Sequence, residues 1–221
     1  MPSPPRSALN QDRIVEAALA LIDEAGLGAL SMRKLGARLG VEAMTLYHYV
    51  PNKDALLDLV VERVAMSAAA AGASTSADWR DRLAHFARRY RAQLIAHPKV
   101  LPLISTRPLR SPEALGEFSQ ALAQMVGQGF APKDAYFALQ AVAMLVIGMA
   151  IAEAGEPAPG AEPLAETPVN GGYAAALQGL FGEAEALEAR HEDSFEFALA
   201  ALLDGLNLRR QPAPPNETIK P

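Results

Sequence analysis

The chain lacks cysteine altogether and is poor in aromatic residues. Of its 221 residues none is Cys, one is Trp and 6% are aromatic. The absence of Cys excludes disulfide scaffolds, cysteine zinc sites, iron–sulfur clusters and thiol catalysis. No HExxH, GxSxG or P-loop motif is present, and the four His residues lack the spacing of metal ligands on one helix face. We therefore expect no enzyme activity, no metal site and no cofactor.

Net charge and the composition of the N-terminal segment exclude further classes of protein. Half of the residues are apolar and 20% are charged, which excludes a chain that is disordered throughout. The formal net charge of −5 argues against a protein that coats nucleic acid, but it leaves room for a local basic face. Residues 1–10 are rich in Pro and Ser and contain no apolar segment, so they do not form a secretory signal. A cytoplasmic location is expected.

Helices are the only regular structure that the sequence pattern predicts. About a fifth of the residues are Ala, the best helix former, and no segment alternates apolar and polar residues over the length of a strand. The predicted fold class is therefore all-α. Apolar spacing and capping residues place helices over 10–25, 31–39, 43–49, 53–71, 79–96, 112–126, 132–154, 173–189 and 193–209.

Three segments are predicted to have no regular structure. Residues 1–9 form a disordered arm, residues 155–172 form a mobile loop rich in Pro, Gly, Ala and Glu, and residues 211–221 form a Pro-rich disordered tail. A different question arises over 135–152, a stretch without charge that approaches the length of a membrane span. We favour a helix buried in a bundle or dimer, because Ala dilutes the run and no excess of Lys or Arg flanks one end.

The most informative stretch is Ser31 to Tyr49, with the sequence SMRKLGARLGVEAMTLYHY. Two short helices joined at Gly40 form a helix-turn-helix unit, and Leu35 and Leu46 have the spacing to pack inward. Residues 31–53 contain four Lys or Arg against one acid, so the outward side is locally positive although the chain as a whole is acidic.

The segment RIVEAALALIDEAGLGALSMRKLGARLGVEAMTLYHYVPNKDALLDLV resembles the DNA-binding domain of the TetR family of bacterial transcriptional repressors. The blocks RKLGARLGV and TLYHYVPNKDALL carry the resemblance, which spans about residues 12–64. STRP at 105–108, GQGF at 127–130 and the apolar helix that follows resemble the core domain of the tetracycline repressor type. The resemblance implies a DNA-binding domain over 10–53, and a ligand-binding and dimerisation domain over 54–210 that begins with a long linking helix.

The resemblance also implies a DNA-binding surface on the second and third helices. Its residues are Met32, Arg33, Ala43, Met44, Thr45, Tyr47, His48 and Lys53. Tyr47, Lys53 and the start of the second helix would hold phosphates and set the register. Base contacts would fall to the third helix, where small and apolar groups suit thymine methyls.

A homodimer is implied as well, because the family is dimeric. The last helix carries a stripe that could pair with the apolar helix 135–152 across a two-fold axis and could also serve as core within one chain. Its residues are Phe195, Leu199, Leu202 and Leu206. Two-fold symmetry predicts a palindromic operator in double-stranded DNA with half-site centres ~34 Å apart.

A small-molecule effector is the remaining partner that the family resemblance implies. It would favour a state in which the two DNA-binding domains no longer fit adjacent grooves, with helix 53–71 as the link. The candidate residues are apolar, aromatic or polar side chains at helical spacing, a pattern that plain core shares. They are Met66, His85, Phe86, Tyr90, Leu103, Arg107, Met125, Phe137, Met144 and Ile147.

Tetracycline itself is a poor match for this core. The positions where the tetracycline repressor holds its magnesium–drug chelate correspond to Ala69, Phe86, Leu103 and Ala121 here. Mg²⁺ requires oxygen-rich or polar ligands, which these residues do not offer. We predict no magnesium–tetracycline response and an apolar or aromatic effector instead.

Two alternatives use the same residues. The protein could be a transcriptional activator with the same DNA-binding domain, a difference that the sequence does not resolve. It could also be an all-α small-molecule-binding protein whose DNA binding is vestigial. Thr45, Tyr47 and Lys53 and the local positive charge argue against that second alternative.

Overall fold

The computed structural model describes residues 9–70, 76–154 and 186–210, and this described part contains helices and no strand. The all-α prediction is confirmed. The helices are α1 (Gln11–Ala25), η1 (Leu27–Ala29), α2 (Met32–Leu39), α3 (Ala43–Leu46), α4 (Lys53–Ala70), α5 (Trp79–Ala96), η2 (Pro98–Val100), α6 (Leu101–Ile104), α7 (Pro112–Gly127), α8 (Pro132–Ala154) and α10 (Ala186–Asn207).

Several sequence predictions concern residues that are not described. The arm over 1–9 (apart from Leu9), the loop over 155–172 and the tail over 211–221 lie outside the described residues. The helix predicted over 173–189 also lies there, except for its last residues, which belong to α10.

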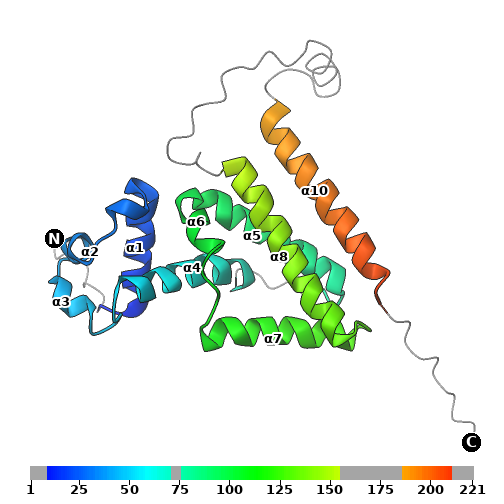
Figure 1. Cartoon of the computed structure of the whole chain (residues 1–221), viewed down its shortest axis with the longest axis horizontal. Helices are drawn as coiled ribbons and strands as arrows, with labels where there is room; N and C mark the ends of the chain where they lie inside the picture. The colour runs from blue at the N-terminus through cyan, green and yellow to red at the C-terminus, as the bar shows by residue number, and fades with distance from the viewer. Residues whose placement is uncertain (1–8, 71–75, 155–185, 211–221) are drawn as a thin grey trace, which may run out of the picture.

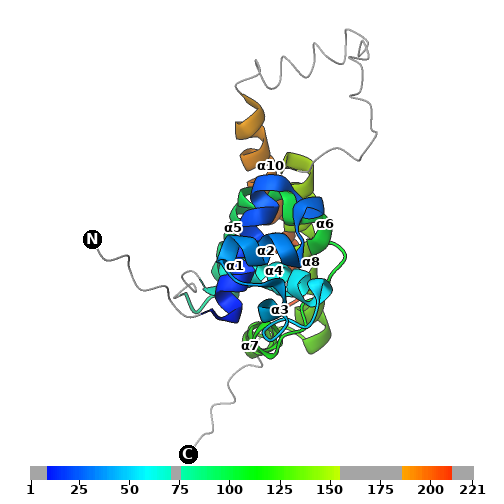
Figure 2. The ribbon, with the colours of Figure 1, turned by 90° about the vertical axis from the view of Figure 1, so that its left-hand side faces the viewer.

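The helices form two groups joined by one helix. Helices α1, α2 and α3 make a small unit at one end of the molecule, here called the head (Figure 1). Helices α5 to α8 and α10 make a larger unit, here called the core, and α4 runs from the head into it (Figure 1). Seen from the head end, α2 and α3 lie in front of the core helices (Figure 2).

Capping side chains place the helix starts where the sequence predicts them. Each cap accepts a hydrogen bond from a backbone N–H in the first turn, at 2.7–3.2 Å, which satisfies a donor that the helix itself leaves unpaired. The caps are Asn10, Ser31, Asn52, Asp78 and Ser111. The helix boundaries within the head are therefore local properties of the sequence.

Two predicted helices have different bounds in the structure. The third helix was predicted over 43–49, but α3 ends at Leu46 and the chain continues in tight turns, with Tyr47 N donating to Met44 O at 3.2 Å. Pro51 disfavours the helical region for Val50, so the turns do not continue as a helix beyond it. The last helix begins at Ala186, seven residues before the predicted start.

The turn between α2 and α3 is tight because two glycines allow it. Gly40 has φ 71°, the left-handed conformation that side chains rarely adopt, and Val41 N donates to Gly36 O at 2.9 Å. A Cβ atom added at Gly36 would lie 2.7 Å from the backbone oxygen of Val41. The absence of a side chain at Gly36 thus sets the distance between α2 and α3.

Helix α4 is buried on more than one side. Leu56, Leu57, Val60, Val61 and Val64 are all at most 8% exposed and form one broad stripe, and Glu62, on another side of the helix, is also 8% exposed. The reason is that α4 contacts α1 in the head and α5, α6 and α7 in the core. One helix therefore contributes to the hydrophobic packing of both units.

Helix α8 contains the apolar run that raised the question of a membrane span. By length and composition it is the one described helix that could cross a membrane, and 33% of its most apolar window is buried within the chain. Ala135, Val142, Val146 and Ala150 are fully buried on one side. The helix is therefore buried on one side within the chain and open on the other.

Substitution of Gly36 tests the account of the turn. Gly36→Ala should destabilise the protein by about 1–3 kcal/mol, because the new Cβ meets backbone that must shift. Gly116→Ala in α7 is the matched control: its Cβ would meet nothing within 4 Å, so it should stabilise the helix by about 0.5–1 kcal/mol. Chemical denaturation measures both, and equal stability of the two variants would contradict the account.

Candidate nucleic-acid interface and effector region

The head is held together by a small apolar core. Five apolar side chains of the head are 0% exposed. They are Ile14 and Ile22 of α1, Leu35 of α2, Leu46 of α3, and Val50 in the turn after α3. The side-chain amide of Gln11 also donates to the carbonyl oxygen of Tyr49 at 3.3 Å. These contacts fix α3 relative to α1, so its outward side chains are presented on a rigid support.

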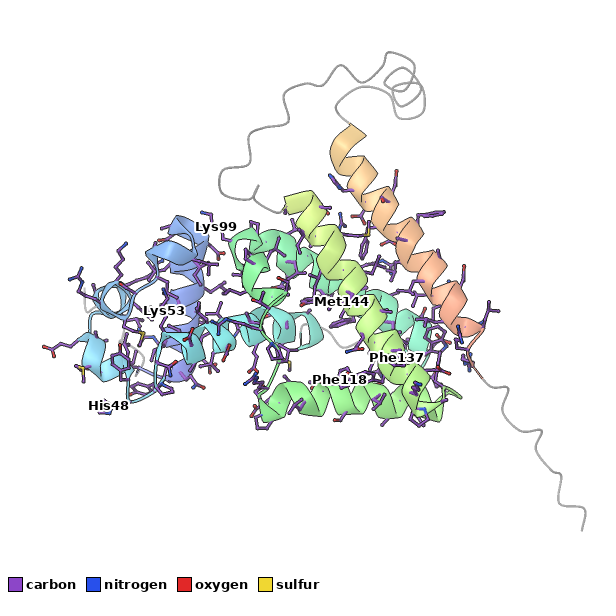
Figure 3. The ribbon with its side chains drawn as sticks, viewed as in Figure 1. His48, Lys53, Lys99, Phe118, Phe137 and Met144 are labelled. Carbon is purple, nitrogen blue, oxygen red and sulfur yellow. The ribbon has the colours of Figure 1, made fainter. Side chains whose placement is uncertain are left out.

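The outward side of α3 is exposed, as a DNA-reading surface requires. Met44 is 69% exposed and Tyr47 is 42% exposed, and His48 is exposed as well. His48 lies at the end of the head that is remote from the core (Figure 3). Ala43 and Thr45 are half-buried.

Cations that are free of carboxylate partners surround this surface. Arg33, Lys34 and Lys53 are exposed, and within the described residues their side chains form no hydrogen bond or ion pair. Their charge is therefore available to phosphates. Lys34 was not among the predicted site residues, although its place beside Arg33 on α2 was a usable signal.

Arg38 has a different role from its neighbours. Its guanidinium donates two hydrogen bonds to the carboxylate of Glu24 at 2.6 Å each, which joins α2 to the end of α1. The hydrogen bond from Arg38 lowers the pKa of Glu24. Arg38 therefore orients α2 within the head, and the outward cations do not include it.

Met32 is the one predicted DNA-contact residue whose side chain is buried. Its side chain is 8% exposed and belongs to the apolar core of the head. It shares the inward side of α2 with Leu35 and Gly36, because positions three and four apart lie on one face of a helix. The side chain of Met32 is thus packed inside the head, whereas Arg33, the next residue, is exposed, and the predicted DNA contact at the start of α2 stays a prediction.

An acidic stripe on α4 holds the segment that joins α6 to α7. Arg107 donates to the carboxylates of Asp54 at 3.0 Å and Asp58 at 2.5 Å. Glu62 is 8% exposed, and its Oε1 accepts the backbone N–H groups of Arg110 and Ser111 at 2.7 Å each. Asp54, Asp58 and Glu62 are four residues apart, and this spacing was a signal for the stripe that the predicted site did not include.

The core also contacts the head directly, through α1. Lys99 donates to the backbone oxygens of Asp23 at 2.9 Å and Glu24 at 3.3 Å, and His97 Nδ1 lies 2.9 Å from Asp23 Oδ2. Lys99 therefore caps the C-terminus of α1 from the core side, between the two units (Figure 3). The position of the head is thus fixed at two places, along α4 and at the end of α1.

The ten predicted effector residues do not all lie together. Met125 and Ile147 are buried at 3% and 8% exposure, and Phe86, Leu103 and Met66 are half-buried. Phe137 and Met144, by contrast, are 50% and 62% exposed on the open side of α8 (Figure 3). The spacing of Phe137 and Met144 is helical, but the stripe to which they belong faces away from the buried residues.

Three polar or aromatic members of that set have definite contacts. Tyr90 is 6% exposed and stacks on Phe86, with ring centroids 5.5 Å apart. Arg107 is engaged by Asp54 and Asp58 on α4, and His85 also has a partner. Arg107 is thus a link between the effector region and α4 in this structure.

A half-open cavity of about 220 Å³ lies between the end of α1, α6 and α8. None of the predicted effector residues lines it. Its lining residues are Gly26, Leu27, Pro98, Lys99, Leu101, Pro102, Ser105 and Ile151.

The predicted dimer stripe is partly used within the chain. Phe195 and Leu199 are 0% and 1% exposed, and Arg91 lies over the Phe195 ring at 4.8 Å from its centroid. Leu202 and Leu206 are half-buried. The open side of α10 instead presents Phe197, which is 77% exposed. Phe195 and Leu199 therefore form core contacts within the chain, and the predicted role of the stripe in a dimer stays a prediction.

The donor chemistry of the core does not fit a magnesium–drug chelate. Leu103 and Phe86, which stand at two of the relevant positions, have no oxygen or nitrogen to offer in their side chains. Among the described residues, no group of three or more His, Asp or Glu lies close enough to hold a metal ion. The prediction about magnesium–tetracycline stays a prediction.

Comparisons with known proteins agree with this division into head and core. Residues 14–60 match the family model of bacterial regulatory proteins of the tetR family. Residues 71–210 match the model of the tetracyclin repressor-like C-terminal domain. The fold and these matches define a helix-turn-helix transcriptional regulator. The chain belongs to the TetR family.

Individual relatives support the same assignment. An HTH-type transcriptional regulator of Saccharopolyspora erythraea is 39% identical over 145 residues, which is 66% of this chain and 61% of that relative. The class A tetracycline repressor from transposon 1721 of Escherichia coli is 31% identical over 207 residues, covering 91% of this chain and 92% of the repressor. A solved structure described as a possible TetR family regulator from Streptomyces coelicolor is 31% identical with a TM-score of 0.70, covering 91% of this chain and 100% of that one.

Proposed function

We propose that the protein is a ligand-responsive transcriptional repressor that binds a palindromic operator as a homodimer and is released by a small apolar or aromatic effector. The observation that supports this most is the exposed surface of α3, flanked by cations without carboxylate partners and held on a rigid head. We expect the protein to act in the cytoplasm, where its DNA lies. A head that had lost DNA binding would not need this combination of exposed Tyr47, His48 and free charge.

Within the head, we assign some residues to contacts with phosphates and others to contacts with bases. Arg33, Lys34, Tyr47 and Lys53 hold phosphates and set the register of the head on the duplex. Ala43, Met44, Thr45 and His48 face base edges, and their apolar groups suit thymine methyls. Met32 contributes packing instead, because its side chain is buried.

The homodimer uses the open sides of α8 and α10. The open side of α8 presents Phe137, Met144 and Ile151, and that of α10 and the turn after it presents Phe197 and Leu208, all at least 44% exposed. Gly148 and Gly205 lie on the same open sides, and a Cβ at either would meet nothing within 4 Å. A glycine in a helix interior is destabilising and no described residue approaches these two, so close approach of a partner helix accounts for them.

The effector acts through α4. A molecule bound among Phe86, Tyr90 and Leu103 displaces the segment between α6 and α7, and Arg107 and Glu62 transmit that displacement to α4. The two heads of the dimer then no longer match adjacent major grooves. The effector needs only to prefer this state, and its differential affinity sets the extent of release.

Two variants of the head distinguish phosphate contacts from base contacts. Lys53→Ala should weaken binding similarly on all DNA sequences and reduce the slope of log affinity against log salt by about one unit. His48→Ala should change the preference among operator variants, because its side chain faces base edges. Fluorescence anisotropy with a set of duplexes over a range of salt concentrations measures both effects.

The matched control for Lys53 is Lys133→Ala, which removes a positive charge from the start of α8 in the core. This variant should keep the salt slope of the wild type. If Lys53→Ala and His48→Ala both bind every duplex as the wild type does, the assignment of the head is refuted.

A glycine variant tests the dimer. Gly205→Leu should shift the protein from dimer to monomer in analytical ultracentrifugation, because the side chain would occupy the space of the partner helix. Gly116→Leu on the exposed side of α7 also adds a side chain into open space and should leave the dimer intact. A monomeric wild type, or a dimeric Gly205→Leu, would contradict the proposed interface.

A further inference from the structure

Tyr90 is a buried polar side chain whose hydroxyl has no hydrogen-bond partner among the described residues. Its side chain is 6% exposed, and its ring stacks on Phe86 with 26° between the planes. Among the residues that the structure describes, none forms a hydrogen bond with the Tyr90 hydroxyl. Buried hydroxyls nearly always have a partner, because burial of an unpaired polar group is unfavourable.

The hydroxyl of Tyr90 is not sealed by packing. In the described part of the chain, the polar side-chain atoms that are both unpaired and without accessible surface are Asp23 Oδ1 and Arg89 Nε. The Tyr90 hydroxyl is unpaired and is not one of these, so it keeps some accessible surface. Water can satisfy a buried hydroxyl that keeps some accessible surface, and so can a ligand atom.

The surroundings favour an uncharged partner for this hydroxyl. Burial raises the pKa of Tyr90 to about 12, so the phenol remains protonated and able to donate at physiological pH. Arg91, the next residue on α5, is already held by Glu153 and Glu192, and Arg107 is held by two aspartates. Both of these guanidinium groups are engaged by carboxylates, and a carbonyl oxygen needs only the Tyr90 donor.

We propose that Tyr90 is the polar anchor of the effector, donating a hydrogen bond to a neutral carbonyl oxygen of a flat unsaturated molecule that lies against Phe86. Phe86 is half-buried and keeps part of its ring accessible for such a contact. The ligand oxygen replaces the water at the hydroxyl. This inference rests on the proposed function and goes beyond it by naming the group through which the effector is recognised.

A pair of probes of one shape tests the anchor. Fluorenone and fluorene share their three rings and differ in a carbonyl against a methylene group. Equilibrium dialysis measures the affinity of each probe for the wild-type protein and for Tyr90→Phe, which removes only the hydroxyl. Fluorenone should bind the wild type about five- to tenfold more tightly than Tyr90→Phe, and fluorene should bind both equally.

The control is Tyr136→Phe, which removes a phenol that is 41% exposed on α8 and bonded to Gln140. It should not change the ratio of fluorenone to fluorene affinity. The anchor would be overturned if Tyr90→Phe lost affinity equally for both probes or for neither. It would also be overturned if the wild type did not bind fluorenone. Tighter binding of fluorene-9-carboxylate than of fluorenone to the wild type would overturn it as well.

A thermal melt distinguishes an anchor from a hydroxyl that merely stabilises the fold. The melting temperature of Tyr90→Phe should equal or exceed that of the wild type, because an unpaired hydroxyl contributes nothing to the fold. A clear decrease would show a structural hydrogen bond and overturn the anchor. Operator binding by the wild type is measured separately. Its absence would refute the proposed repressor, whereas the probe affinities and the melting temperature decide the anchor.

Discussion

The structure depends on one helix that is packed by two units at once. Helix α4 buries Leu56, Val60 and Val64 completely, and it contacts both α1 in the head and the core helices. Its acids are engaged from the core by Arg107 and by the backbone of Arg110 and Ser111, while its Arg63 is bound to Asp12 and Glu16 of α1. The helix cannot shift without changing contacts on both sides, which is the physical basis for coupling an event in the core to the position of the head.

The head and the core expose different kinds of surface. The head directs its free cations and the exposed side of α3 outward, whereas three cations of α5 are paired within the core: Arg80, Arg88 and Arg91 bind acids of α8 or α10. Positive charge is thus available on the head although the chain has a formal net charge of −5. The core leaves apolar surface open instead, on one side of α8 and α10, as expected for a helix bundle that a second copy completes.

The sequence predicts those features that depend on neighbours along the chain. Caps at Asn10, Ser31 and Asp78 and the turn at Gly40 are local, and the helices begin or end there as predicted. Features that depend on residues far apart in the sequence were harder to predict. Helical spacing showed that Phe195 and Leu199 share a stripe, but which stripe meets the chain itself depends on where α5 and α8 lie. The pairing of Arg38 with Glu24, and of Arg107 with α4, likewise joins residues that only the tertiary fold brings together.

The central claim is that two copies of this head read two halves of one operator. The most direct test is selection of binding sites from a random-sequence DNA library by the full-length protein, with excess non-specific competitor at near-physiological salt. Enrichment of an inverted repeat with half-site centres ~34 Å apart, about one turn of the duplex, is expected. Enrichment of a single unpaired half-site, or no enrichment by a protein shown to be folded and dimeric, would contradict the claim.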